Sequence, residues 1–205
     1  MAETIKAVVW DMGGVLLKEM DPRPRQELSQ EFQVSLKKLY ELVFQSESAR
    51  KATTGAIGEG DHWKWIFQQL GLNEADQKRF YTHFWSGDGL DTQLISFIRE
   101  LKPRYQTGLL SNAWSGSREA LRDSYKCLDA FDAVIISSEI GLAKPDPAIY
   151  LKMLNQLGVE GNETIFVDDL TENVIAAKAL GMHGIKFVST EQAIHDVRSL
   201  IGSSN

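Results

Sequence analysis

The sequence between residues 5 and 17 reads IKAVVWDMGGVLL, and this stretch decides the fold. Its first six residues form a largely apolar, partly β-branched run, which is typical of a buried strand in a parallel sheet. Asp11 ends the run, and Gly13 and Gly14 let the backbone turn sharply and come close to a ligand. A carboxylate at the carboxyl end of a parallel strand lies where open α/β sheets bind their ligands. Taken alone, Asp11 is better explained as a turn former or a helix cap, so its interpretation depends on the rest of the chain.

The rest of the chain alternates strand-like and helix-like segments. Three further segments have the composition of core strands and a fourth is a weaker candidate; they cover residues 106–110, 133–137, 164–167 and, as the weaker one, 184–188. This alternation predicts an α/β fold, a Rossmann-like parallel sheet with helices on both faces. Apolar residues recur at helical spacing between the strands, namely Leu94, Ile98 and Leu101, and then Ile149, Met153 and Leu157.

One region breaks the alternation. Residues 18–88 show helical patterns and no convincing strand, so we expect a helical cap inserted after the first strand, with residues 1–17 and 89–205 forming the α/β core. Such an insertion would cover the ligand end of the sheet as a lid. Trp65 lies off the apolar stripes of this region and is interpreted either as a cleft residue or as a partly exposed surface residue. The stripes, interpreted as a packed helical core, are Leu36, Leu39, Tyr40 and Val43, and Trp63, Ile66, Phe67 and Leu70.

Composition excludes several classes of protein. The 205 residues suffice for one domain with a modest insertion, and the net charge of -6 without a long basic run argues against a nucleic-acid partner or an acidic membrane surface. Cys127 is the only cysteine, which excludes a disulfide framework and a cysteine-rich metal site. The sequence has neither the apolar core of a signal peptide nor a membrane-spanning run, so we expect a cytoplasmic protein.

Polar residues follow the later strands as well. Ser111 and Asn112 end the second predicted strand, Lys144 follows the third after a short loop, and Asp168 and Asp169 end the fourth. Each has an ordinary alternative, because hydroxyl, amide and carboxylate groups cap helices and a lysine is often a solvated surface charge. Taken together these residues favour a functional site, because parallel strands bring their carboxyl ends to one edge of the sheet.

The carboxylates among them favour a magnesium site. Asp11, Asp168 and Asp169 should converge, and clustered carboxylates repel one another and hold protons unless a cation is present. Mg²⁺ takes one or two carboxylates, keeps several waters and accepts phosphate oxygens. Lys144 would supply a second positive charge. A free carboxylate beside the metal can then attack phosphorus, so that an aspartyl-phosphate forms. The sequence therefore predicts phosphate chemistry at this edge.

Neutral donors for a phosphate group are also present. The candidates are the Ser111 hydroxyl, Asn112, and the backbone amides of Gly13 and Gly14. Such donors stabilise phosphate oxygens without adding charge. The expected substrate is therefore a small phosphorylated metabolite.

These motifs, in this order and spacing, resemble those of the haloacid dehalogenase-like hydrolase superfamily. The resemblance implies that Asp11 is the nucleophile and a magnesium ligand and that Ser111 binds phosphate. It also implies that Lys144 neutralises the negative charges of the nucleophile and of the phosphate. Asp168 and Asp169 match the acidic fourth motif of the family. The helical insertion resembles the family's cap of the first type, and the resemblance extends over essentially the whole chain.

The resemblance also divides the roles within the fourth motif. It implies that Asp169 is the metal ligand, that Asp168 lies behind it, and that Asn173 lies near the waters of the metal. The backbone carbonyl of Gly13 is a further implied ligand.

One position departs from the pattern of family phosphatases. They usually carry a second aspartate two residues after the nucleophile, which protonates the leaving group and then activates water; here that residue is Gly13. Loss of a general acid–base group typically lowers a rate about 10²–10⁴-fold. Glu19 and Asp21 lie just downstream and are possible substitutes.

Three functions therefore stay open. The first is a magnesium-dependent phosphatase. The second is a 2-haloacid dehalogenase-like hydrolase, since those enzymes also lack the second aspartate, although they use no metal and Asp168 and Asp169 would be an uncompensated pair there. The third is a degenerate domain that binds a phosphate or a protein without turnover. The sequence does not determine the substrate or the oligomeric state.

Overall fold

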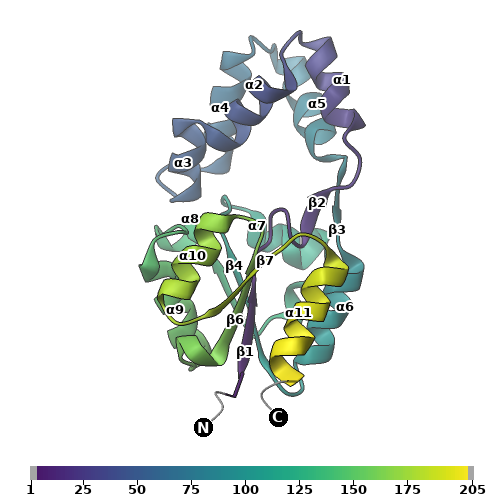
Figure 1. Ribbon diagram of the computed structural model, residues 1–205. Helices are drawn as coiled ribbons and strands as arrows, with labels where there is room; N and C mark the ends of the chain where they lie inside the picture. The colour runs from purple at the N-terminus through teal and green to yellow at the C-terminus, as the bar shows by residue number, and fades with distance from the viewer. Residues whose placement is uncertain (1–3, 203–205) are drawn as a thin grey trace.

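The computed structural model describes residues 4–202 and has a five-stranded parallel sheet at its centre (Figure 1). The strand order is β5-β4-β1-β6-β7, and all neighbours run parallel, so the predicted α/β fold class is confirmed. Asp11 follows the central strand. The strands are β1 (Ala7–Trp10), β4 (Gln106–Ser111), β5 (Ala133–Ile136), β6 (Thr164–Asp168) and β7 (His183–Lys186).

Helices cover both faces of the sheet (Figure 1). Helices α6 (Thr92–Leu101) and α11 (Thr190–Gly202) pack on one face, and α9 (Pro147–Leu157) and α10 (Thr171–Ala179) pack on the other. Each face of the sheet has its own hydrophobic core. Because side chains alternate along a strand, Trp10 of β1 lies in the core beneath α6 and α11, and Val9 lies in the core beneath α9 and α10. Short elements complete the connections: α7 (Ser117–Glu119), η2 (Ala120–Ser124), η3 (Leu128–Ala130), α8 (Ser137–Ile140) and η4 (Gly161–Glu163).

A group of helices between β2 and β3, here called the helical segment, forms a third core of its own. Ser35, Ser46 and Asn73 cap three of its helices by accepting a hydrogen bond from a backbone N–H. Most residues of the predicted stripes point into this core, where Leu39, Val43, Trp63, Ile66 and Phe67 are buried, whereas Tyr40 is only half-buried. The elements are α1 (Arg23–Glu31), α2 (Leu36–Tyr40), η1 (Glu41–Gln45), α3 (Glu47–Thr53), α4 (Glu59–Gln69) and α5 (Glu74–Trp85).

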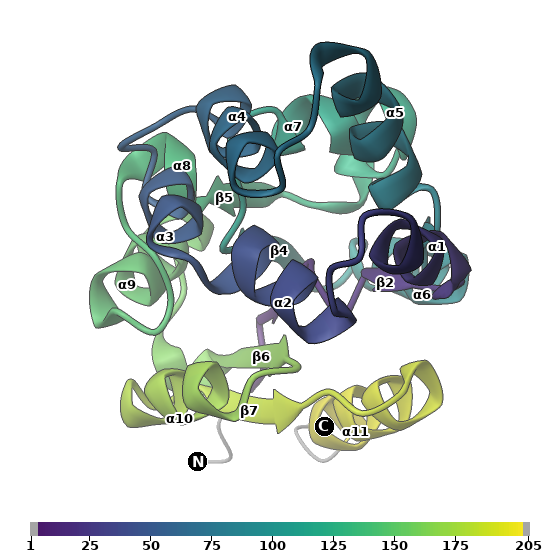
Figure 2. The same cartoon turned by 90° about the horizontal axis from the view of Figure 1, so that it is seen from above.

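A short antiparallel ribbon joins the helical segment to the rest of the protein. It pairs β2 (Leu17–Glu19) with β3 (Asp88–Leu90), at the two ends of the region in which the sequence indicated no strand. Three residues are too few to show an alternating pattern, and the two strands pair because the chain enters and leaves the helical segment side by side. Seen from above, the helical segment spreads over the carboxyl ends of the central strands (Figure 2). Within residues 4–202, no helix has the length and apolar character needed to cross a membrane.

Replacing Trp63 by alanine is expected to lower the free energy of unfolding by about 3–5 kcal/mol. Trp63 is 3% exposed, and its ring lies 5.0 Å from that of Tyr81 and 5.5 Å from that of Phe84, so truncation leaves a large cavity. Denaturant titration measures the change. Trp65→Ala is the matched control, since Trp65 is only half-buried on the same helix. Equal losses in the two variants would contradict the assignment of Trp63 to the core.

Candidate active site

Three carboxylates meet at the carboxyl edge of the sheet. Asp11 directly follows β1, Asp168 ends the neighbouring strand β6, and Asp169 comes next. One oxygen from each lies within 4.8 Å of the others. The pairing of β1 with β6 produces this cluster, because it aligns Trp10 with Val167 and so brings the following residues together.

Lys144 lies between two of these carboxylates. Its Nζ donates to Asp11 Oδ1 at 2.6 Å and to Asp168 Oδ2 at 2.7 Å, and the residue is 5% exposed. Burial lowers the pKa of a lysine, but the two carboxylates outweigh that effect and raise the pKa of Lys144. Lys144 therefore stays charged and neutralises part of the cluster.

The cluster keeps an excess of negative charge. Burial raises the pKa of Asp11 to about 6, although Lys144 opposes the shift, and burial together with Asp168 raises the pKa of Asp169. Asn173 also places its Oδ1 atom in a buried position with no hydrogen-bond partner among the described residues. Oxygen donors around an uncompensated negative charge are the set that a hard divalent cation prefers. The residues present therefore fit Mg²⁺.

Asp168 and Asp169 have different surroundings. Asp168 is fully buried, and besides Lys144 it accepts from Asn173 Nδ2 at 3.0 Å and from the Leu170 backbone N–H at 2.7 Å. Asp169 is only half-buried and lines the large cavity described below. Asp168 thus binds protein groups, whereas Asp169 faces the space where a ligand would lie.

Asn112 is used differently from what the sequence indicated. Its Oδ1 accepts from the Lys144 backbone N–H at 2.8 Å, and its Nδ2 donates to the Lys144 carbonyl at 2.8 Å. This amide clamp fixes the Lys144 loop to the end of β4, a positioning role that the sequence analysis missed. Ser111 is 1% exposed and does not line the cavity, so contact between its hydroxyl and a phosphate stays a prediction.

The two glycines of the first motif differ in their constraints. Gly14 has a φ of +79°, and a Cβ there would clash with the Asp169 carboxylate. Its N–H donates to the Leu17 carbonyl at 2.8 Å, and the contact of this amide with a phosphate stays a prediction. A Cβ on Gly13 meets nothing within 4 Å, and Gly13 is not in the left-handed region.

A cavity of about 1160 Å³ lies between the sheet edge and the helical segment. Asp11, Lys144 and Asp169 line it on the side of the sheet. Trp65 is not part of the lining, so the interpretation of Trp65 as a cleft residue is wrong; its ring stacks on His62 instead. Tyr40, which the sequence assigned to the packed helical core, lines the cavity instead. Further aromatic residues that the sequence did not indicate also line it: Phe44, Tyr81, Trp85, Trp114, Tyr125 and Phe187.

The two possible substitutes for the missing acid are engaged elsewhere. Glu19 lines the cavity, but its carboxylate accepts from the Tyr40 hydroxyl at 2.8 Å and pairs with Arg25 at 3.1 Å. Asp21 lies outside the cavity lining and forms an ion pair with Arg23 at 2.6 Å. Neither carboxylate is therefore poised for proton transfer.

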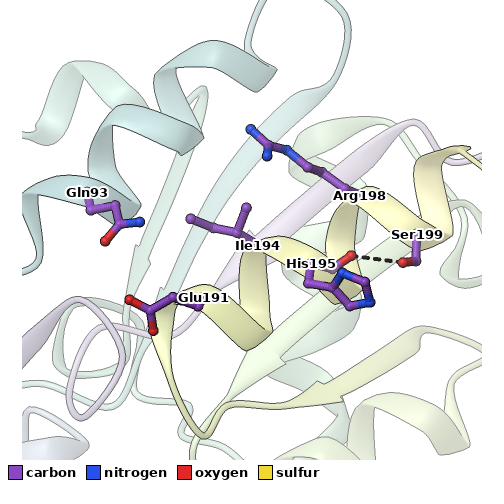
Figure 3. Close-up of a pocket in the computed structure, with 6 residues that line it drawn as sticks. All are labelled: Gln93, Glu191, Ile194, His195, Arg198 and Ser199. Carbon is purple, nitrogen blue, oxygen red and sulfur yellow. Dashed lines mark hydrogen bonds between the residues drawn. The ribbon is translucent and has the colours of Figure 1, made fainter.

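A smaller hollow of about 440 Å³ lies between α6 and α11 (Figure 3). There the Ser199 hydroxyl donates to the His195 carbonyl at 2.9 Å, and the Arg198 side chain extends away from α11, with its guanidinium 5.2 Å from the ring centroid of Phe97 in α6. None of the predicted site residues belongs to this hollow. Its lining is Gln93, Glu191, Ile194, His195, Arg198 and Ser199.

Comparison with known proteins identifies the family of the chain. A model of the family described as haloacid dehalogenase-like hydrolase matches residues 5–181. A sesquiterpene phosphatase from Aspergillus oryzae is 32% identical over 203 residues, which cover 98% of this chain and 100% of that protein. A D-ribitol-5-phosphate phosphatase from Bacteroides thetaiotaomicron is 25% identical over 185 residues, covering 86% of this chain and 89% of that one.

A solved structure has the same fold. An enzyme of the haloacid dehalogenase-like family from Bacteroides thetaiotaomicron, in complex with magnesium and inorganic phosphate, superposes with a TM-score of 0.74 at 23% identity. The alignment covers 89% of this chain and 93% of that one.

Proposed function

The chain belongs to the haloacid dehalogenase-like hydrolases, and we propose that it is a magnesium-dependent phosphatase that acts through a phosphorylated Asp11. The observation that carries the proposal is the position of the Asp11 carboxylate, buried at the sheet edge between Lys144 and two further carboxylates. Relatives named as phosphatases support the reaction class. The substrate is a small phosphorylated molecule.

In this proposal Asp11 is the nucleophile. One of its carboxylate oxygens attacks phosphorus, and the bond from phosphorus to the ester oxygen breaks, so that the alcohol leaves as an alkoxide and takes a proton from water. Water then attacks the aspartyl-phosphate, which releases phosphate and restores the carboxylate. Lys144, at 2.6 Å from Asp11 Oδ1, keeps that carboxylate ionised and offsets the negative charge of the phosphate.

Asp11, Asp169 and the Gly13 carbonyl would hold the magnesium ion, as the family resemblance implies. When bound, the ion supplies positive charge that lets a carboxylate and a phosphate dianion approach each other. Asp168 orients Lys144, and Asn173 fixes Asp168 through its Nδ2. The unpartnered Oδ1 of Asn173 would be available to waters on the ion, as the family resemblance implies. We assign phosphate binding to the Ser111 hydroxyl and to backbone amides of Gly13 and Asn112.

The helical segment is proposed to act as the cap, with residues 18–88 as its extent. It contributes the side of the cavity opposite the sheet edge, including Phe44 and Trp85. Closure over a bound ester would exclude water from the reacting phosphorus. Only the ribbon of β2 and β3 connects it covalently to the core.

Gly13 stands where family phosphatases usually carry an acidic residue, and the lack of that general acid favours one alternative, a domain that binds phosphate without turnover. A panel of phosphate monoesters assayed with and without magnesium separates the two, because a binding domain releases no phosphate. Chloride release from 2-haloacids tests the dehalogenase alternative, which the excess negative charge of Asp168 and Asp169 disfavours.

Asp169→Asn is expected to weaken magnesium binding at least about tenfold, because the ion loses a charged ligand from a small set. Calorimetric titration of Mg²⁺ into the mutant and the wild type measures this without relying on turnover. Asp61→Asn, on an exposed position of α4, is the control. Equal dissociation constants in mutant and wild type would refute the ligand assignment.

A further inference from the structure

The side of the cavity opposite the sheet edge is a continuous aromatic wall. Phe44 is at its centre, with ring centroids 5.9 Å from those of Tyr40 and Trp85 and 6.1 Å from that of Trp114. Phe44 is 41% exposed, so a large apolar surface faces the cavity instead of the core. Aromatic surface of this kind, next to a polar reaction site, is typical of a pocket that buries the apolar body of a ligand.

Most polar groups on this wall are already paired with one another, and Trp85 Nε1, which has no partner among the described residues, is buried. Arg25 donates to both oxygens of Asp88, at 2.7 and 2.8 Å, and the Tyr40 hydroxyl donates to Glu19. A polyol bound here would have to lose its water and find few free partners, which carries a net cost. The wall therefore selects against sugar-like groups.

The same wall is also unsuited to a cationic ligand. The Arg25 guanidinium lies 4.4 Å from the centroid of Phe84, 5.5 Å from that of Tyr40 and 5.6 Å from that of Trp85. A cation of the protein thus already lies against these rings, which leaves their faces less available to a cationic ligand.

We propose that the substrate is the phosphate ester of a bulky apolar alcohol, whose carbon skeleton lies against the aromatic wall while its phosphate meets Asp11. The position of the phosphate rests on the proposed function; the apolar wall does not. The volume of about 1160 Å³ slightly exceeds the usual range of small-molecule pockets, so it accommodates a skeleton of many carbons.

Chain length is the first test. Each buried methylene improves binding about fourfold, so kcat/KM for octyl phosphate, below its micelle concentration, is expected to exceed that for ethyl phosphate at least about 100-fold. A pentitol phosphate is expected to be no better than ethyl phosphate. A ratio of octyl to ethyl near one, or a preference for the pentitol ester, would overturn the proposal.

A pair of variants links the preference to the wall. Phe44→Ala is expected to lower kcat/KM for octyl phosphate about tenfold while leaving ethyl phosphate within about threefold. Phe32→Ala is the matched control, because Phe32 packs on Phe80 in the helical core and lies outside the cavity. Equal effects of Phe44→Ala on both esters would contradict the role of the wall.

Binding of non-hydrolysable phosphonates separates this proposal from the proposed function. If no ester is turned over with magnesium, the phosphatase assignment fails. Octylphosphonate that still binds at least about 100-fold more tightly than ethylphosphonate, with a negative heat-capacity change, would then uphold the apolar site. Equal affinities would overturn the apolar site, whether or not the enzyme is active.

Discussion

Asp11→Asn is expected to lower phosphate-ester turnover by about 10⁴-fold or more, with the fold intact. An amide is nearly isosteric with a carboxylate but is a far weaker nucleophile, and removal of a nucleophile is among the largest single effects in enzymes. Release of inorganic phosphate from the best available ester measures the loss. Asp21→Asn is the control, because Asp21 lies outside the cavity and pairs with Arg23.

Stability provides a second measurement on the same mutant. Burial raises the pKa of Asp11 to about 6, above its unfolded value of about 3.9, so the folded metal-free protein holds this proton more tightly than the unfolded chain. Stability of the metal-free wild type therefore falls as the pH rises from about 4 through 6, and the uncharged asparagine removes that loss. Metal-free Asp11→Asn should thus be at least as stable as wild type at pH 7, since the buried Lys144 ammonium still forms its ion pair with Asp168. Full activity in a folded mutant would refute the aspartyl-phosphate mechanism.

Gly13→Asp is expected to raise kcat for alkyl phosphates by about 10²-fold, and at most about 10⁴-fold. The added carboxyl group would protonate an alkoxide that otherwise leaves as a high-energy anion. The structure permits the substitution, because a Cβ at Gly13 meets no atom within 4 Å and the backbone there is not left-handed. The gain should be largest for alkyl esters and small for aryl esters, whose leaving groups need little protonation.

The decisive measurement compares an alkyl phosphate with p-nitrophenyl phosphate. Gly13→Asn is the matched control, since it has the same shape without an acidic proton. Equal changes on both substrates, or an equal gain in Gly13→Asn, would show that the missing acid does not limit the rate. Gly14 cannot serve this purpose, because its φ of +79° and the nearby Asp169 exclude a side chain.

Much of the fold was predictable because it depends on local patterns. Each predicted strand is present with bounds shifted by at most two residues, and the helical stripes of residues 94–101 and 149–157 are buried as expected. The ribbon of β2 and β3 was not predictable, because its pairing joins residues about 70 positions apart and each strand has only three residues. The sequence carries no local signal for such a contact.

The candidate site likewise has features that were predictable from the sequence and features that were not. The convergence of Asp11, Asp168 and Asp169 was predictable, because parallel strands bring their carboxyl ends to one edge of the sheet. The clamp between Asn112 and the Lys144 backbone depends on where one loop passes, and the loop conformation is set by tertiary packing. Phe44 and Trp114 illustrate a third case, because cavity aromatics and ordinary surface aromatics have the same sequence pattern.

The ribbon also bears on the order in which the protein folds. Strand β1 pairs with β4 although about 95 residues separate them, and closing so long a loop is entropically costly. When the helical segment is folded, hydrogen bonds such as that from Met20 N–H to the Gly87 carbonyl hold its two ends together. The connection between β1 and β4 is then shortened by about 70 residues. On the logarithmic scale of loop closure this lowers the cost by about 1–2 kcal/mol. Folding of the helical segment first would therefore make the pairing of β1 with β4 nearly local along the chain, so the segment that covers the cavity would also help to form the central sheet.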